Sequence, residues 1–546
     1  MLTGWRDVWR WAVLLPALLL ALPVLVIFAS LLQPQTEIWQ HLRQTVLADY
    51  VVNSLLLAGG TGLGALLLGT GSAWLVSQYQ FIGRRFIQWL LLLPLAMPAY
   101  IIAYTYTGLL DFAGPLQSYL RELTGWRYGD YWFPQIRSLG GAIIMLSLVL
   151  YPYVYMLART AFSEQSASLF EASRTLGSTP RQHFWRVALP LARPAILTGT
   201  ALAMMEAFAD YGTVQYFGVT TFTTGIFRTW FGMGSQAGAA QLAALLTGFV
   251  LMLLLLEQWS RRKIRYFHQG QRSQSQALRK TSAGRQLVIL LLCSVPLLFG
   301  FIVPATQLAS WALTNYQLTL NQQFLTLIWN SFSLAALSAG VVVLLALLFA
   351  YGKRLRRDVL VLAPVRVAAL GYAVPGTVIA IGVMIPLAYV DGHIDALAEQ
   401  WFGVRTGLIF SGTLFALVLA YSVRFLAVSL HSVEAGLQRI KPSMDNAARS
   451  LGCSPFKVLQ RVHVPLLRSS VLAALLLVFV DVLKELPATL ILRPFNFNTL
   501  AVRTYELASD ERLADAALPA LAIVLVGLLP VILLARSVKA VNGETP

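Results

Sequence analysis

Long apolar runs separated by short polar segments make up most of the chain. Each run approaches or exceeds the ~20 apolar residues that a helix needs to cross a bilayer. A strand of a membrane β-barrel would alternate apolar and polar positions instead, so the pattern predicts an all-α protein with many transmembrane helices. The twelve predicted spans are 11–32, 51–76, 87–109, 139–158, 194–211, 238–256, 287–309, 329–351, 360–389, 406–430, 469–492 and 516–535.

The two halves of the chain resemble each other at matched positions and in the same order. Asn53 and Pro98 correspond to Asn330 and Pro375, and Gly177 corresponds to Gly452. A fourth match pairs "TFTTGIFRTW" (221–230) with "NFNTLAVRTY" (496–505), which sets Phe222 against Phe497 and Arg228 against Arg503. Four ordered matches predict two parallel six-helix repeats related by an axis along the membrane normal. The predicted boundaries are 1–256 for the first repeat, 257–286 for a basic cytoplasmic linker and 287–546 for the second repeat.

Composition and charge agree with a membrane protein. Hydrophobic residues make up 57% of the chain and charged residues only 12%, against about 25% in a typical soluble domain. With both termini in the cytoplasm, the predicted cytoplasmic segments hold 29 of the 41 Lys and Arg residues, as the positive-inside rule requires. This distribution accounts for the net charge of +17 without any nucleic-acid partner. The two cysteines, Cys293 and Cys453, indicate neither a disulfide framework nor a metal site.

Two polar inserts interrupt the apolar pattern at the same place in each half: "EASRTLGSTPRQHFWRVALP" (171–190) and "NAARSLGCSPFKVLQRVHVP" (446–465). In each, good helix formers precede a glycine that can end a helix, and a proline three residues later suits the start of another. We expect this second helix to end at Pro190 or Pro465, and His183 and His463 to be surface groups. One alternative is an amphipathic helix that only touches lipid headgroups. The repetition instead favours docking of a partner with two copies of one groove.

The inserts resemble the cytoplasmic loop signature of ABC importer permeases, with Ser173 and Asn446 as departures from the usual Ala and Glu. The resemblance implies the type I ABC importer permease fold, in the inner membrane of a bacterium. It also implies that these loops are coupling helices held by two copies of an ATPase subunit. The chain has no G-x-x-x-x-G-K-[ST] loop, so we expect no enzyme activity and no cofactor here, with ATP bound by the partner subunits. The docking residues that the resemblance implies are Glu171, Ala172, Gly177, Pro190, Asn446, Ala447, Gly452 and Pro465.

Ionisable residues also lie within two predicted spans. Glu206 and Asp210 in the first repeat correspond to Asp481 and Glu485 in the second, where Lys484 lies between them. A spacing of four residues places each acidic pair on one face of a helix. Such groups are costly in a membrane, and two interpretations stay open: they line or gate the translocation path, or they form a structural salt bridge or lie near the outer water interface.

The stretches around these acids, "EAFADYGTVQYFGVTTFTTGIFRTWF" and "KELPATLILRPFNFNTLAVRTYELA", resemble those of ferric-iron ABC importer permeases. The resemblance implies a periplasmic protein that delivers Fe(III) to a fused permease. Hard Fe(III) favours carboxylate and phenolate oxygens, so the acids and several tyrosines are candidate transient contacts, although each tyrosine alone fits packing or an interfacial belt better. The tyrosines are Tyr100, Tyr104, Tyr151, Tyr153 and Tyr155.

Two arginines, Arg228 and Arg503, are predicted on the outer side, where they are either contacts for an acidic face of the binding protein or solvated loop charges. No protein ligand set for a metal is identified. Alternative functions are import of another small solute such as thiamine, sulfate or a polyamine, ion-coupled secondary transport, and a membrane-anchored scaffold.

Overall fold

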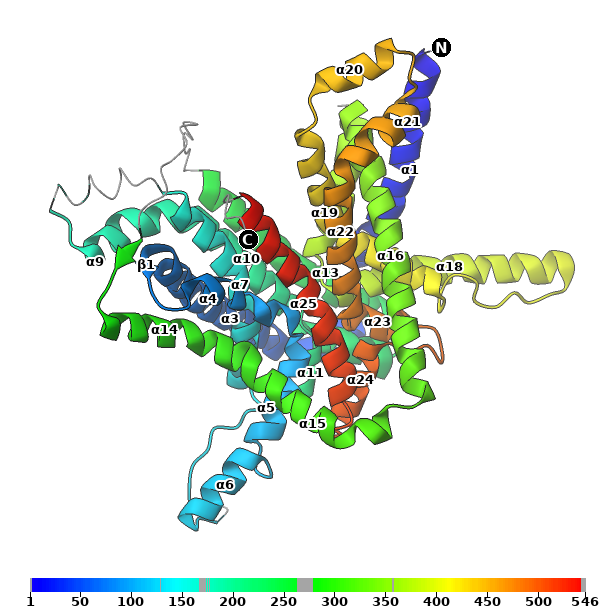
Figure 1. Ribbon diagram of the computed structural model, residues 1–546. Coiled ribbons are helices and arrows are strands. Elements are labelled where there is room, and N and C mark those ends of the chain that lie inside the picture. The colour runs from blue at the N-terminus through cyan, green and yellow to red at the C-terminus, as the bar shows by residue number, and fades with distance from the viewer. Residues whose placement is uncertain are drawn as a thin grey trace. The chain divides into compact units, whose positions relative to one another are not determined.

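The computed structural model describes residues 2–127, 129–165, 173, 175, 177–262, 278–355 and 358–541, and almost all of its regular structure is helical. The described chain forms two compact units (Figure 1). Unit 1 consists of Met1–Leu42, Gly225–Thr247 and Gln317–Thr504. Unit 2 consists of Arg43–Thr224, Gly248–Tyr316 and Tyr505–Pro546.

Unit 1 contains α1 (Leu2–Ala29), η1 (Ser30–Leu32), η4 (Arg228–Gly232), α16 (Gln322–Leu355), α17 (Val359–Ala369), η6 (Leu370–Ala373), α18 (Gly376–Phe402), α19 (Leu414–Gln438), α20 (Pro442–Ser450), α21 (Pro455–Val458), η7 (Leu459–His463), α22 (Val464–Leu483) and α23 (Pro487–Leu492).

Unit 2 contains α3 (Leu47–Gln78), β1 (Tyr79–Gln80), α4 (Arg84–Leu90), η2 (Leu93–Ala96), α5 (Ala99–Leu110), α6 (Pro115–Thr124), α7 (Leu139–Ser163), α9 (Pro180–His183), η3 (Phe184–Ala188), α10 (Leu189–Ala209), α11 (Gly212–Tyr216), β2 (Arg279–Lys280), α14 (Ala283–Leu297), η5 (Leu298–Ile302) and α25 (Ala517–Val541). The helices that continue from one unit into the other are α2 (Thr36–Thr45), α12 (Phe222–Phe227), α13 (Gln236–Arg262), α15 (Val303–Thr319) and α24 (Leu500–Ser509).

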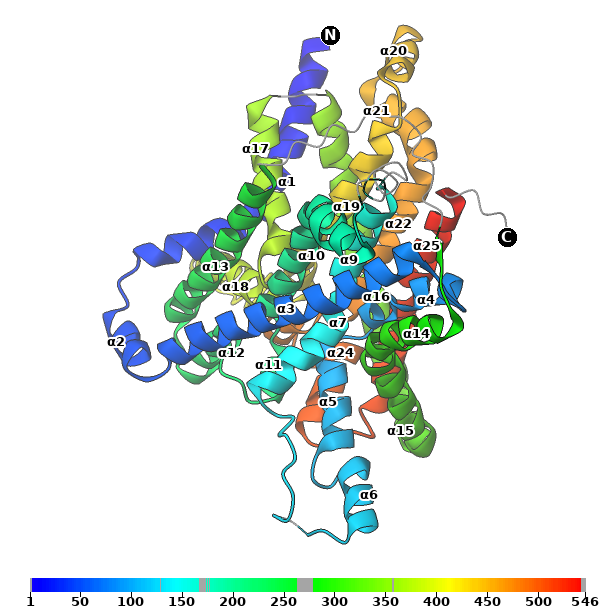
Figure 2. The ribbon, with the colours of Figure 1, turned by 90° about the vertical axis from the view of Figure 1, so that its left-hand side faces the viewer.

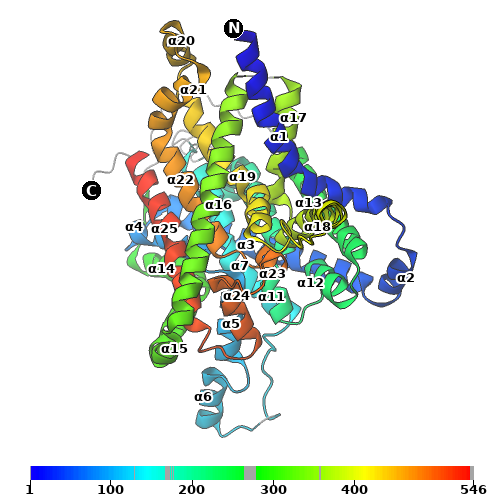
Figure 3. The same cartoon turned by 90° about the vertical axis from the view of Figure 1, so that its right-hand side faces the viewer.

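Small residues allow close helix packing in both units, as is usual where lipid replaces water around a bundle. In unit 1, α16, α19 and α22 pack on one another, and α1 packs along α17 and α18 (Figure 3). In unit 2, α3, α7 and α10 form the equivalent trio (Figure 2). A Cβ atom added at Gly69 on α3 or at Gly199 on α10 would lie 2.7 Å from Val154 on α7. Both helices therefore approach α7 at backbone distance.

The compact units do not follow the predicted sequence repeats. Helix α1 lies in the first predicted repeat but packs against α16 to α19 of the second. Conversely, α14 lies in the second repeat and packs against α3 and α4 of the first. The repeat boundaries stay a prediction from the sequence, while each compact unit combines helices from both repeats.

Ten helices in the described part of the chain are long and apolar enough to cross a membrane, and an eleventh is gained if a pair bent by 93°, Arg84–Ala96 and Ala99–Thr124, counts as one span. The expected span 360–389 is also broken, between η6 and α18. Both breaks occur where the sequence has a matched proline: Pro98 (φ −59°, ψ 140°) and Pro375 (φ −55°, ψ 145°) precede the new helix. The expected span 516–535 corresponds to α25, which begins at Ala517 and continues to Val541.

Candidate functional site

The two predicted docking loops, loop 1 (residues 164–190) and loop 2 (residues 439–465), share one backbone motif. Gly177 and Gly452 have left-handed φ angles of +77° and +79°. The amide of the residue after each glycine donates to a carbonyl five residues back, Ser178 to Ser173 at 3.0 Å and Cys453 to Ala448 at 3.1 Å. In loop 2 this motif ends α20 (Pro442–Ser450), as expected from the sequence.

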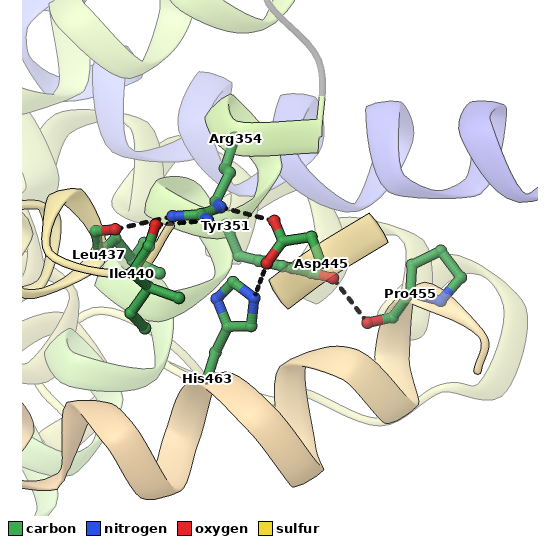
Figure 4. Close-up of polar contacts among 7 residues, drawn as sticks. All are labelled: Tyr351, Arg354, Leu437, Ile440, Asp445, Pro455 and His463. Carbon is green, nitrogen blue, oxygen red and sulfur yellow. Dashed lines mark hydrogen bonds and ion pairs between the residues drawn. The ribbon is translucent and has the colours of Figure 1, made fainter. Parts of the chain in front are cut away.

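A buried polar cluster fixes loop 2 to the end of α16 (Figure 4). The Arg354 guanidinium donates to Asp445 at 2.8 Å and to the carbonyl oxygens of Leu437 and Ile440 at 2.7 and 2.9 Å. His463 Nε2 and the other Asp445 oxygen are 2.8 Å apart. Helix α20, which carries Asp445, is thereby tied to α16, to the end of α19 and to the π-helical turn η7.

Asp445 is an anionic anchor for this cluster. Although burial alone would raise the pKa of its carboxyl group, the hydrogen bonds from Arg354 and His463 hold the pKa below its usual value. Beside the cluster, the Tyr351 hydroxyl donates to the Pro455 carbonyl at 2.7 Å, and the Tyr351 ring packs edge-on against His463. Loop 2 is therefore held from both sides of Gly452.

Loop 1 is held differently. Ser173 Oγ and His183 Nδ1 are 2.8 Å apart and buried, and His183 lies beside Trp74 on α3. Trp74 on α3 corresponds to Tyr351 on α16 in the sequence repeat, so an aromatic ring from the equivalent helix contacts a histidine in each loop. The prediction that His183 and His463 are surface groups is wrong, because their exposed fractions are 3% and 0%. A single histidine in a basic loop carries no sequence signal for these long-range contacts.

The second helix of each loop does not end at its proline, which corrects the expected boundary. The chain passes through the π-helical turns η3 and η7 and continues as α10 and α22. The amides of Leu189 and Val464 donate five residues back, to Phe184 and Leu459. Because Pro190 and Pro465 lack an N–H group, a π-helical turn accommodates each proline without breaking the helix.

Of the other predicted docking residues, Asn446 and Ala447 are exposed on α20. Glu171 and Ala172 lie outside the described residues.

The second acid of each membrane pair caps a short helix. Asp210 accepts from the Val214 amide at 3.1 Å at the start of α11. Glu485 accepts from the amides of Ala488 and Thr489, both at 3.0 Å, at the start of α23. Each carboxylate thus satisfies helix amides that have no partner within the helix.

This geometry corrects the expected placement of each acidic pair on one helical face. Helix α10 ends at Ala209 and α22 ends at Leu483, so the second acid of each pair lies beyond the helix that carries the first. Asp481 forms an ion pair with Lys484 at 2.8 Å, as the structural-salt-bridge interpretation anticipated. Glu206 is partly exposed on α10.

Of the predicted tyrosines, Tyr104 is buried and donates to the Ala516 carbonyl at 3.4 Å, and Tyr153 is half-buried on α7. Tyr151 and Tyr155 donate to the carbonyls of Leu91 and Gln88 at 2.9 and 2.8 Å, so their hydroxyls are engaged in packing. Tyr100 instead joins a cluster with Tyr211 and Tyr505. The ring centre of Tyr505 lies 6.4 Å from that of Tyr100 and 6.2 Å from that of Tyr211. Tyr211 directly follows Asp210, so this cluster gathers phenol groups beside the α11 cap.

The repeats also share a hydrogen-bonded connection near the predicted arginines. Asn53 donates to the Thr220 carbonyl at 2.9 Å, and Asn330 donates to the Asn498 carbonyl at 3.2 Å. The next residue in each repeat, Ser54 or Ser331, accepts from the amide of Phe222 or Leu500. Leu500, rather than Phe497, therefore takes the position equivalent to Phe222. The segment from Glu485 to Leu500 is three residues longer than the matching segment from Asp210 to Phe222.

With this register Arg228 and Arg503 are not equivalent, and only Arg228, in the π-helical turn η4, is well exposed.

A family model described as "Binding-protein-dependent transport system inner membrane component" matches the chain twice, over residues 65–266 and 343–543. The Fe(3+)-transport system permease protein FbpB 2 of Haemophilus influenzae is 28% identical over 535 residues, which cover 96% of the chain and 98% of that protein. The ferric transport system permease protein FbpB of Actinobacillus pleuropneumoniae is 23% identical, covering 84% and 66%. The molybdenum transport system permease protein ModB of Haemophilus influenzae is 27% identical over 40% of the chain and 95% of its own length.

Proposed function

The chain belongs to the binding-protein-dependent transport system inner membrane component family, and from this premise we propose that it is the fused permease of an ATP-driven ferric-iron importer. It is a multi-pass inner membrane protein and a transport permease rather than an enzyme. The observation that carries the proposal is the repeated docking motif in a chain that resembles a ferric permease along almost its whole length.

Two copies of a separate ATPase bind loops 1 and 2 and supply the energy of transport. The support is the left-handed glycine and matching backbone hydrogen bond in both loops, together with the anchoring of loop 2 to α16. Exposed side chains on α20, including Asn446 and Ala447, are left to contact the ATPase. ATP binding draws the two ATPase subunits together, and the anchored loops transmit that movement to the spans.

Both termini face the cytoplasm in this proposal. Within unit 1, the N-terminal end of α1 lies at the same end as α20 and α21 (Figures 1 and 3). The charge distribution along the sequence favours the same orientation. A periplasmic binding protein then delivers substrate at the opposite side, where Arg228 and Arg503 are candidate contacts.

Ferric iron is the proposed substrate because the relatives that span the chain are ferric permeases, whereas the molybdenum permease matches only 40% of it. The phenols of Tyr100, Tyr211 and Tyr505 beside Asp210 offer hard oxygen donors of the kind that Fe(III) prefers. Asp210, together with Glu206, Asp481, Lys484 and Glu485, belongs to the proposed path or gate.

The experiment measures ATP hydrolysis by the permease purified with its ATPase and reconstituted in lipid. We expect iron-loaded binding protein to stimulate hydrolysis more than iron-free binding protein does, whether alone or with molybdate or sulfate added. Equal stimulation by all forms would remove the assignment of iron. Ion-gradient uptake without any ATPase would remove the importer assignment.

A further inference from the structure

Helix α18 extends beyond the bundle of unit 1 as a braced arm (residues 386–413), which consists of its second half and the segment that returns to α19. Asp391 has an exposed fraction of 1% and accepts from the amides of Phe410 and Ser411 at 3.0 and 2.7 Å. The Ser411 hydroxyl donates to the same carboxylate. This aspartate closes the base of the arm.

Two more acids continue the brace at intervals of four residues, along the same face of α18. Asp395 accepts from the amides of Thr406 and Gly407 at 2.7 and 3.0 Å. Glu399 forms an ion pair with Arg405 at 3.1 Å. The returning segment therefore binds the polar face of the arm, while Glu399 and Arg405 at its far end stay exposed to water.

The opposite face of the arm is apolar and exposed. Val390, Ile394, Leu397 and Trp401 recur at spacings of four, three and four residues, which line one side of a helix. The exposed fractions of Leu397 and Trp401 are 55% and 74%.

Unit 2 has a comparable excursion at the same place in the other repeat. Helix α6, which follows α5 (Figure 2), exposes Leu116, Tyr119 and Leu123 at spacings of three and four. Leu123 has an exposed fraction of 70%.

We infer that both apolar faces lie in the lipid–water interface and anchor the permease to the bilayer surface. The base of α18 packs against α23, at the end of α22 away from α21. From there α18 runs across the direction of α16 and α19 and leaves their bundle sideways (Figures 1 and 3). Because α16 and α19 are candidate membrane spans, a helix that leaves the end of their bundle in this direction runs parallel to the plane of the bilayer.

The apolar face of the arm favours lipid over a protein partner. Other helices of the same unit also expose large apolar side chains, such as Val359 and Leu360 on α17. Amphipathic helices with Trp, Phe and Leu on one face insert that face about 5–10 Å into the headgroup region. Trp401 stands at the tip, where an indole suits the interface.

The test uses nitroxide spin labels on single cysteines of the full transporter in liposomes, with Cys293→Ala and Cys453→Ser as background. Leu397→Cys reports on the apolar face, and Glu399→Cys on the opposite face of the same turn is the matched control. We expect the label at 397 to collide several-fold more with oxygen, which partitions into lipid, than with a water-soluble nickel chelate. The label at 399 should show the reverse preference.

Adding saturating binding protein separates the alternatives. If lipid covers the apolar face, the label at 397 keeps its preference for oxygen. A label at 397 that favours the nickel chelate in liposomes, and is then shielded by binding protein, would overturn the inference in favour of protein docking. The pair Leu123→Cys and Glu122→Cys on α6 repeats the comparison where Leu397→Cys fails to assemble.

Discussion

Replacing Asp445 with Asn should loosen loop 2 without changing its shape. The amide keeps the size of the carboxylate but removes the charge that faces Arg354 and His463, whose side chains are 18% and 0% exposed. Arg354 keeps its bonds to the carbonyls of Leu437 and Ile440, so the loss is smaller than for a charge left without any partner. We expect the local stability of loop 2 to fall by about 2 to 3 kcal/mol.

The assay is hydrogen exchange of the backbone amides in residues 441–454, measured on the permease in lipid. A loss of this size corresponds to a rise in the exchange rate of roughly 30- to 150-fold, because each 1.4 kcal/mol changes an opening equilibrium tenfold. Glu434→Gln is the matched control, since Glu434 pairs with Lys353 at the same end of the bundle but both side chains are about a quarter exposed. Its removal should cost at most about 1 kcal/mol. Equal exchange in the two variants would refute the anchoring role of Asp445.

Four further outcomes follow from the same geometry. The pKa of Asp445 is lower in the folded than in the unfolded state, so its contribution to stability is complete above about pH 4 and is lost as the pH falls through the folded pKa. In that acidic range, protection of the loop 2 amides from hydrogen exchange should decrease in the parent protein but not in Asp445→Asn. Gly452→Val or Gly177→Val should cost about 1 to 2 kcal/mol at a left-handed φ and reduce co-purification of the ATPase, whereas unchanged recovery would contradict a docking role. Asn330→Ala should lower the free energy of unfolding by about 1 kcal/mol, as Asn53→Ala should, and thermal unfolding of the two variants compares them. Tyr505→Phe should reduce iron uptake while ATP hydrolysis stimulated by the binding protein stays normal, and a normal uptake rate would remove Tyr505 from the path.

Local sequence signals predicted the parts of the site that depend on neighbouring residues. Gly177 and Gly452 have left-handed φ angles and the same hydrogen bond across the turn in both repeats. This motif depends only on neighbouring backbone, so the local sequence was enough to predict it. Pro98 and Pro375 break helices for the same reason. The acids Asp210 and Glu485 were also found, although their capping role required knowing where α10 and α22 end.

The parts that were missed depend on contacts between distant segments. Arg354 and Asp445 are 91 residues apart, and nothing around either residue indicates that they meet. The burial of His463 follows from this cluster and from Tyr351. The interleaving of the repeats, with α1 packed on helices of the second repeat, likewise leaves no trace in local periodicity.

Uptake of radioactive Fe(III) into proteoliposomes tests the central claim most directly. The vesicles contain this permease with its ATPase, enclose ATP, and are offered iron-loaded binding protein outside. We predict accumulation that requires ATP and both loops, and that falls when Gly177 and Gly452 are replaced with Val. Accumulation of molybdate or sulfate in place of iron, or iron uptake that persists without the ATPase, would contradict the account.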